Sequence, residues 1–467
     1  MMDFVIRISP EGDMEFRRSE GEKKVDCGDG IKAYLYGVVD APEALCQMAA
    51  EDDGAFPAKR HEIIGAYTLV TVDEAKKRLR LYRSSMGGNK PVYYAAMEDG
   101  LYIFSSIKCL KQLGYPCAFN DDRDVVCDFI YNGFIRTKDT LIRGIYKLLA
   151  DEYIAVDSGN MAIGHIPRIL ADASIVSLDE MYATEKRVIH SYIDMALGLG
   201  PDINIAISGG YDSNLILHFL KERGLPAHAF SVGGQRGLDE TETARKLCEH
   251  SGNAAFHKGS VGRNTLSHMK EIAEALEGEV YERGVFLQYS LGKLLQENGV
   301  RCMILGEGSD QVFNRNFYVD KVPEFLTNYM DDPYELGIML VMKKSYMMLE
   351  HFGIVGLYPF IHEDMQHLGA KIFHENGTSK IRQKEMCTRY FDDYMNELIA
   401  KNPGSTSLCA LFESKEEEEK FIAHIKEHNA FYDPAFRISY KYGSGESELD
   451  YYLCLEYLKA FKEVFCD

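Results

Sequence analysis

The sequence predicts an α/β protein of two domains, an antiparallel β domain followed by a doubly wound domain with a parallel sheet. Three observations support this fold class. The chain has 467 residues, which is long for one ordinary core. Several short β-prone runs at close spacing occupy its first third. From residue 203 onward, apolar runs alternate with helical patterns, as in folds whose ligands bind at the carboxyl ends of parallel strands.

Composition and charge favour a soluble, cytoplasmic protein. Lys and Arg number 52 and Asp and Glu 72, giving a net charge of −20 that disfavours a nucleic-acid partner. The sequence shows no signal-peptide pattern and no apolar run of membrane-spanning length, so we expect no membrane partner. The eleven cysteines include no CxxC pair, which indicates reduced thiols. A homodimer is left open.

The first domain is predicted to cover residues 1–170 and the second residues 171–467. In the first, strands are expected within 1–8, 66–72, 78–82, 92–94 and 101–104, separated by charged or Gly/Asn-rich turns. The strand-rich composition gives way to a helical pattern at Met181 to Leu199, which sets the boundary. Further strands are expected at 203–207, 227–232 and 301–305.

A glycine-rich segment directly follows the run 203–207 and reads Ser208-Gly209-Gly210-Tyr211-Asp212-Ser213. A strand, a tight turn and a helix start aim backbone N–H groups at an anion. The glycines allow close approach to a phosphate, the serines add donors, and Asp212 could hold Mg²⁺. The GxxxxGK[ST] and GxGxxG patterns are absent. A plain glycine turn with capping residues is the alternative; we prefer a phosphate site because the whole motif follows a strand.

A second polar segment, Gly306-Glu307-Gly308-Ser309-Asp310, follows the apolar run 301–305. Two carboxylates beside small residues at the end of a parallel strand suit a magnesium ion and a polar reaction centre. Taken alone, this segment would be read as a turn. Its pairing with the glycine-rich segment, each directly after a strand, makes it a candidate for the same site.

The glycine-rich segment resembles the pyrophosphate-binding loop of the PP-loop ATP pyrophosphatases, and the two segments together resemble the asparagine synthetases. The resemblance implies a PP-loop (adenine nucleotide α-hydrolase-like) domain with a helical C-terminal part. It also implies that Asp212 and Asp310 share Mg²⁺ on the pyrophosphate of ATP and that Glu307 faces the adenylate and the incoming amine. Backbone groups near adenine would come from Ser231 and Val232. The implied nucleotide contacts are Ser208, Gly209, Gly210, Asp212, Ser213 and Gly306.

The first domain is similar, between Gly65 and Leu110, to the glutaminase domain of the asparagine synthetases, which implies an Ntn-hydrolase-like antiparallel β sandwich. A working glutaminase of this type uses an N-terminal cysteine whose α-amine is its base. Met2 stands at that place, and the Arg, Asn-Gly and Gly-Asp segments that hold glutamine are missing. We therefore expect an inactive relic, as in the similar β-lactam synthetases and lasso-peptide cyclases.

Other positions depart from the family in the acceptor region. Glu307 matches the asparagine synthetases, whereas β-lactam synthetases have tyrosine there. Gln311 stands where the family has an acid, residues 314–316 replace its Gly-Gly-Tyr, and the stretch ending at His362 lacks the family's arginine and aspartate. These departures indicate that the substrate is not aspartate.

A cation must offset the charge that spreads onto the phosphates in an AMP-forming ligase. Two lysines are candidates, Lys441 and Lys384, and the alternative for either is a solvated surface residue. We prefer Lys441 because of its order along the chain.

The leading hypothesis is an ATP-dependent, AMP-forming amide ligase with ATP and Mg²⁺ as cofactors. Its partners would be a small-molecule or peptide carboxylate and an amine, without glutamine hydrolysis, in natural-product or peptide modification. An intramolecular cyclase of the β-lactam synthetase or lasso-peptide type is the first alternative. A PP-loop thiolation or tRNA-modifying enzyme and a catalytically inactive scaffold are the others; the acidic charge argues against the former and the intact carboxylates against the latter.

Overall fold

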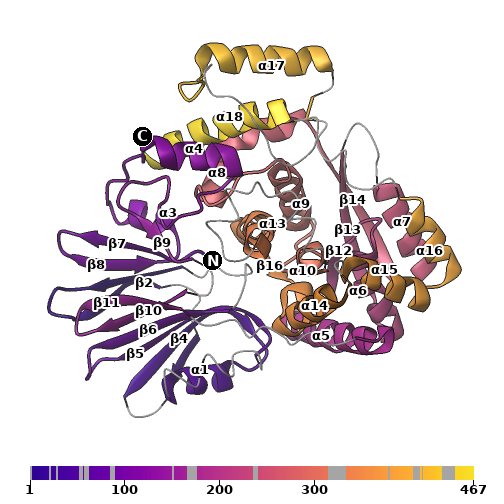
Figure 1. Cartoon of the computed structure of the whole chain (residues 1–467), viewed down its shortest axis with the longest axis horizontal. Helices are drawn as coiled ribbons and strands as arrows, with labels where there is room; N and C mark the ends of the chain where they lie inside the picture. Colours follow the sequence, from indigo (N-terminus) through magenta and orange to yellow (C-terminus); the bar gives the residue numbers. More distant parts are fainter. Residues whose placement is uncertain are drawn as a thin grey trace. The chain divides into compact units, whose positions relative to one another are not determined.

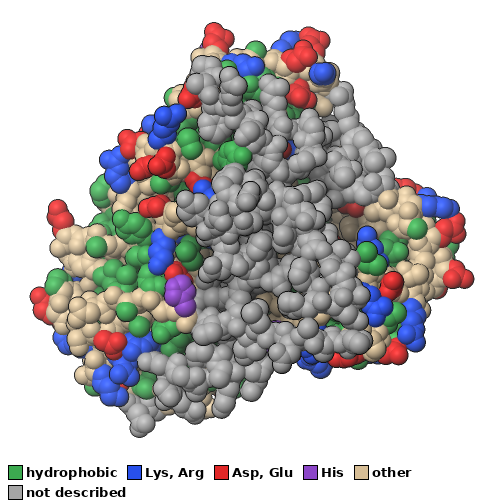
Figure 2. All heavy atoms as spheres, viewed as in Figure 1, with side chains coloured by type: hydrophobic (Ala, Val, Ile, Leu, Met, Phe, Trp, Pro, Cys, Tyr) green, Lys and Arg blue, Asp and Glu red, His purple; other side chains and the backbone are tan. Residues whose placement is uncertain are grey.

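The computed structural model describes residues 3–19, 23–27, 30–51, 56, 63–84, 90–149, 152–165, 176–234, 240–313, 333–376, 379–402, 411–412, 414–433 and 447–467 (Figure 1). The chain forms two compact units. The first comprises 1–129, 135–169 and 465–467, and the second comprises 130–134 and 170–464. Figure 2 shows acidic and basic side chains interspersed over the described surface in this view.

Two antiparallel sheets make up the first unit. The five-stranded sheet has the order β2-β1-β8-β7-β9 and the six-stranded sheet the order β11-β10-β6-β5-β4-β3. The strands are β1 (Phe4–Ile8), β2 (Met14–Ser19), β3 (Lys23–Asp26), β4 (Ile31–Val39), β5 (Gly65–Asp73), β6 (Arg78–Arg83), β7 (Tyr93–Met97), β8 (Gly100–Phe104), β9 (Tyr146–Lys147), β10 (Glu152–Asp157) and β11 (Asn160–His165). The helices are α1 (Pro42–Glu51), α3 (Ile107–Gln112) and α4 (Arg123–Asn132), the last of which runs into the second unit.

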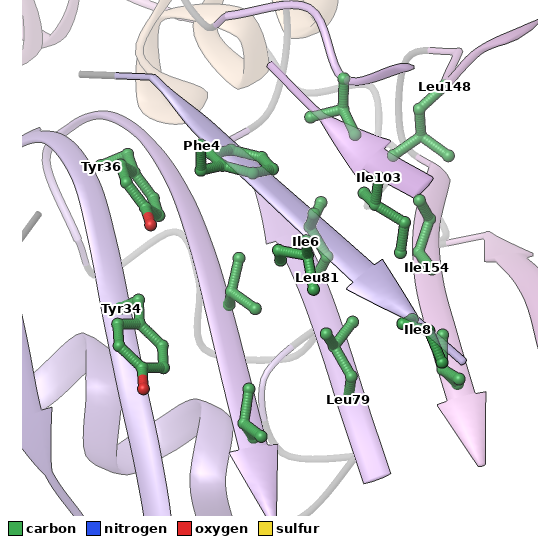
Figure 3. Close-up of a cluster of buried hydrophobic side chains, with 14 residues drawn as sticks. Phe4, Ile6, Ile8, Tyr34, Tyr36, Leu79, Leu81, Ile103, Leu148 and Ile154 are labelled. Atoms are coloured by element: carbon green, nitrogen blue, oxygen red, sulfur yellow. The ribbon is translucent and has the colours of Figure 1, made fainter. Parts of the chain in front are cut away.

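The core of this unit lies between the two sheets. Phe4, Ile6 and Ile8 of β1 point toward Leu79 and Leu81 of β6 (Figure 3). Alternate residues of a strand point to the same face, so one row of apolar side chains from each sheet fills the space between them. The unit is therefore a β sandwich, and the expected antiparallel fold class is confirmed.

The second unit contains a parallel sheet of order β14-β13-β12-β15-β16. Its strands are β12 (Asn204–Ala206), β13 (Ala227–Gly234), β14 (Ala254–Val261), β15 (Cys302–Ile304) and β16 (Val355–Leu357). The central strand pairs on both sides, because Ile205 lies opposite Ala229 of β13 and Ile304 of β15. Helices cover both faces, and most residues of the central strands β12, β13 and β15 are buried. The expected doubly wound class is confirmed.

Helices of the second unit pack on both faces of this sheet (Figure 1). The helices of the second unit are α5 (Leu178–Leu199), α6 (Tyr211–Glu222), α7 (Thr241–Ser251), η2 (Arg263–His268), α8 (Met269–Leu276), α9 (Val285–Glu297), α10 (Ser309–Phe313), α13 (Pro333–His351), η3 (Pro359–Ile361), α14 (Glu363–Asn376), α15 (Ser379–Tyr390), α16 (Asp393–Ala400), α17 (Lys415–His428) and α18 (Ser447–Phe465). Those in contact with the strands of the sheet are α5, α6, α7, α9 and α13. Among the helices of the described residues, none has the length and apolar character needed to cross a bilayer.

The strand order reverses between β12 and β15. From β12 the chain proceeds through α6 and α7 to β13 and β14 on one side, and later strands are added on the other side. A right-handed crossover in each direction places α6 and α7 on one face and α9 and α13 on the other. The loops after β12 and β15 thus follow the carboxyl ends of two adjacent strands at the reversal point, where ligands bind in sheets of this kind. Both segments singled out in the sequence begin at this point.

Candidate functional site

The loop after β12 holds its shape by internal hydrogen bonds. The N–H of Ser208 donates to Ser213 Oγ at 3.0 Å, and the N–H of Gly210 donates to Ser208 Oγ at 3.2 Å. Gly210 is the N-cap of α6 and, in the described structure, has no side-chain capping hydrogen bond. The first N–H groups of a helix have no intrahelical acceptor, so this end of α6 can receive an anion.

Asn214 is a part of this loop that sequence reasoning missed. Its side chain is fully buried, and its amide donates to the carbonyl oxygens of Ser208 at 3.0 Å and Gly210 at 2.7 Å. These bonds turn two carbonyl groups of the loop toward the helix. Carbonyl oxygens would repel a phosphate, so their orientation favours the anion site.

The two predicted segments touch at Gly306. A Cβ atom at this position would lie 2.9 Å from the backbone nitrogen of Ser213, so only glycine lets the second loop lie against the first turn of α6. Two residues later, Gly308 has φ +95°, a left-handed backbone that other residues rarely adopt. Close packing at Gly306 therefore brings the second loop to the phosphate loop.

A chain of polar contacts connects Asp212 to the helical layer. The hydroxyl of Ser309 donates to Asp212 Oδ1 at 2.7 Å and lies 3.0 Å from the amide oxygen of Gln383 on α15. The amide nitrogen of Gln383 donates to Glu185 Oε2 on α5 at 3.4 Å. The network that orients Asp212 is shielded from solvent, because its other members, Ser309, Gln383 and Glu185, are buried.

Asp212 fits a role in binding Mg²⁺, because its half-buried carboxylate stands in the first turn of α6 beside the phosphate loop. Asp310 is exposed in the first turn of α10, next to Ser309. No group of three or more His, Cys, Asp or Glu side chains in the described ranges is placed to hold a metal ion. Mg²⁺ commonly takes one or two carboxylates and completes its shell with phosphate oxygens and water. Sharing of one ion by Asp212 and Asp310 stays a prediction.

Glu307 lies on the α9 and α13 side of the second loop. The side-chain amide of Gln288, on α9, donates to Glu307 Oε1, and Oε2 is shielded from solvent. Burial raises the pKa of the Glu307 carboxyl, against the opposing effects of Lys344, Ser345 and Gln288. The pKa of the buried phenol of Tyr358 is also raised, first by burial and then by the charge of Glu307. Gln288 and Tyr358 were missed from the sequence, where nothing marks them as polar site residues.

The remaining predicted residues occupy different surroundings. Ser231 and Val232 are buried in the second half of β13, directly after Phe230, which lies opposite the last residue of β12. They are therefore near the start of the phosphate loop, and their contact with adenine stays a prediction.

Lys384 is exposed on α15, where its neighbour Gln383 is the residue that faces the site. Lys441 falls outside the described residues, as do Met2 and residues 314–316. Which lysine serves the reaction stays a prediction.

Comparisons with known proteins match both units. A family model described as asparagine synthase matches residues 201–395, and one described as glutamine amidotransferase domain matches residues 47–165. Asparagine synthetase (glutamine-hydrolyzing) 1 of Bacillus subtilis (strain 168) is 21% identical over 231 residues, which are 48% of this chain and 36% of that protein. Asparagine synthetase B (glutamine-hydrolyzing) of Escherichia coli (strain K12) is 20% identical over 363 residues, 73% of this chain and 60% of that protein. The chain therefore spans less than two thirds of either relative's length.

Proposed function

We propose that this chain, which is similar to the asparagine synthetases, is an ATP-dependent ligase that forms AMP and pyrophosphate and joins a carboxylate to an amine. The observation that carries this proposal is the meeting of two loops at the point where the strand order reverses. There Gly306 lies against the start of α6 and Ser309 holds Asp212. A phosphate-binding loop beside a positioned carboxylate suits the departure of pyrophosphate.

In the proposed reaction an oxygen of the substrate carboxylate attacks the α-phosphorus of ATP. A new O–P bond forms, and the bond from that phosphorus to pyrophosphate breaks. The N–H groups of the loop and of the first turn of α6 would hold the departing pyrophosphate. Bound Mg²⁺ would supply positive charge that offsets the charge of the phosphates, with Asp212 and Asp310 as its ligands. A cation from Lys441 or Lys384 would act in the same sense.

Amide formation would follow at the other side of the second loop. The amine nitrogen attacks the carbonyl carbon of the acyl-adenylate, a C–N bond forms, and the C–O bond to AMP breaks. Glu307 would take a proton from the nitrogen. The pKa of Glu307 is raised toward physiological pH, and a carboxylate with a pKa closer to the working pH is a stronger base.

We propose that the amine does not come from glutamine. This rests on the resemblance to the family, because the first domain shows no match to the family's segments that hold glutamine. In addition, the start of β1 is filled by a buried ion pair, in which Lys90 Nζ lies 2.6 Å from Asp3 Oδ1. An incubation with glutamine should release no glutamate, and measurable release would contradict this part of the proposal.

The acceptor region supports a substrate other than aspartate, in natural-product or peptide modification. Gln311 is buried in α10, and His362 is buried with its ring nitrogen Nδ1 3.6 Å from Asp364 Oδ2. These residues replace two acids of the family pattern. A substrate whose binding depends on those two acids would therefore not bind at this place.

Exchange of labelled pyrophosphate into ATP, measured with a panel of carboxylic acids, tests the adenylation step. At least one acid should support exchange, and Asp212→Asn should lower the rate by a factor of about 10² or more, as loss of a charge-stabilising group does. Glu222→Gln makes the same change at the far end of α6, where Glu222 pairs with Lys186, and should leave exchange intact. Equal rates for wild type and Asp212→Asn would contradict the proposal.

A further inference from the structure

The contact between Gln288 and Glu307 fixes the orientation of a buried amide. Gln288 is 2% exposed, and its Nε2 donates to Glu307 Oε1. A carboxylate accepts hydrogen bonds and does not donate them, so the amide must turn its nitrogen toward Glu307. The amide oxygen of Gln288 is therefore directed away from this bond.

Two acceptor atoms of this pair are left unmatched. Gln288 Oε1 and Glu307 Oε2 are shielded from solvent, and neither has a hydrogen-bond partner among the residues that the structure describes. Buried polar atoms in proteins are nearly always paired, and an exception points to a ligand or water. Here both unmatched atoms are oxygens, so the missing group must be a donor.

The cations near this pair are already engaged. Lys344 pairs with Glu282, and Lys343 on the same helix pairs with Glu279. The Ser345 hydroxyl lies 3.1 Å from that of Tyr358. Lys344 and Ser345 both favour the charged form of Glu307, but each also has another partner. The two unmatched oxygens therefore remain for a donor brought by a substrate.

We propose that Glu307 Oε2 and Gln288 Oε1 together bind the nitrogen nucleophile, and that Gln288 determines its class. Two acceptors require two N–H donors. A neutral primary amine, or ammonia, supplies both and still directs its lone pair at the acyl carbon. A neutral secondary amine has one N–H group and would leave one buried oxygen unpaired. The inference rests on the proposed function and adds to it a requirement for an unsubstituted or singly substituted nitrogen.

The test uses ammonium chloride, methylamine and dimethylamine as nitrogen probes, with the carboxylate that supports pyrophosphate exchange. AMP formation is measured against probe concentration. For the wild type we expect kcat/KM for methylamine to exceed that for dimethylamine by about tenfold or more, as the loss of one hydrogen bond to a buried acceptor implies. Comparable kcat/KM values for methylamine and dimethylamine in the wild-type protein would by themselves overturn the inference.

Gln288→Met keeps the size of the side chain and removes its acceptor. We expect KM for methylamine to rise by about tenfold, the preference over dimethylamine to shrink, and pyrophosphate exchange to change far less than KM. Gln296→Met makes the same substitution at an exposed position of α9 and should behave as wild type. An unchanged amine preference in Gln288→Met, or equal losses in exchange and amide formation, would overturn the inference. A wild-type protein with no exchange would overturn the proposed function itself, and this inference with it.

Discussion

Gln383 shows how a residue with no motif of its own can matter for the site. It is fully buried on α15 and lies between Ser309, which holds Asp212, and Glu185. Asp212 could be predicted because it belongs to a contiguous motif after a strand. Gln383 could not, because its place depends on how α15 packs on α10 and α5, which the order of residues does not disclose.

We predict that Gln383→Leu weakens binding of Mn²⁺·ATP by about tenfold, because residues that orient a metal ligand typically contribute that much to metal affinity. Titration calorimetry, or the electron paramagnetic resonance signal of Mn²⁺, gives the affinity without any turnover. Thr388→Val on the exposed face of α15 is the matched control. Equal affinities in Gln383→Leu and wild type would show that Asp212 needs no support from Gln383.

The raised pKa of Glu307 leads to a pH-dependent stability. A carboxyl group with a higher pKa in the folded state binds more protons there than in the unfolded state, so its contribution is lost as pH rises from the ordinary glutamate pKa through the raised one. Glu307→Gln has no titrating group at this position, so this loss of stability does not occur in the variant. Burial and Glu282 disfavour the charged form, while Lys344, Ser345 and Gln288 favour it.

We therefore predict that the melting temperature of Glu307→Gln rises relative to wild type between pH 4 and pH 7. Thermal melts followed by fluorescence at several pH values measure this difference. A constant difference across the range would mean that Glu307 has the same pKa in both states.

At the scale of elements, α13 is fixed by two adjacent lysines near its middle. Lys343 pairs with Glu279 and Lys344 with Glu282, and both acids lie in the segment that leads into α9. Lys343 and Glu279 are almost fully buried. Removing one partner of a buried pair leaves a charge in a poorly hydrated place and destabilises strongly, whereas replacing both partners by apolar groups can be neutral.

We predict that Lys343→Met lowers the free energy of unfolding of the second unit by roughly 3–5 kcal/mol and that adding Glu279→Leu recovers most of this loss. The exposed pair of Lys401 and Glu397 serves as control, where Lys401→Met should change stability by at most about 1 kcal/mol. Denaturant titration of the four proteins measures the differences. A double variant as unstable as the single one would contradict this account of the pair.

Strands that form a contiguous apolar or aromatic run were predictable, and strands with a weaker pattern were not. The runs 66–72 and 227–232 became β5 and β13 within one or two residues. In the first unit β2, β3, β4, β9, β10 and β11 were missed, and in the second unit β14 and β16 were missed. β14 alternates in exposure and contains a glycine and a lysine that weaken its pattern, and β16 has only three residues at the edge of the sheet. Their pairing comes from neighbouring strands, a tertiary effect that a local pattern does not carry.

At the scale of the whole molecule, the site depends on the order of the strands. β12 and β15 lie far apart in sequence and adjacent in the sheet, so their loops meet. The alternation of strands and helices predicted a parallel sheet, and the two motifs predicted that these strands are neighbours. The residues behind the motifs, such as Asn214 and Gln288, follow only from packing.

The central claim is that a carboxylate oxygen becomes bonded to the α-phosphorus of ATP. The most direct measurement uses the carboxylate that supports exchange, labelled with ¹⁸O in both oxygens, together with ATP, Mg²⁺ and an amine. Mass spectrometry of the nucleotide product follows the label. Our account predicts AMP that carries one ¹⁸O atom, formed in equal amount with pyrophosphate and amide. Unlabelled AMP, or ADP with labelled phosphate, would contradict it.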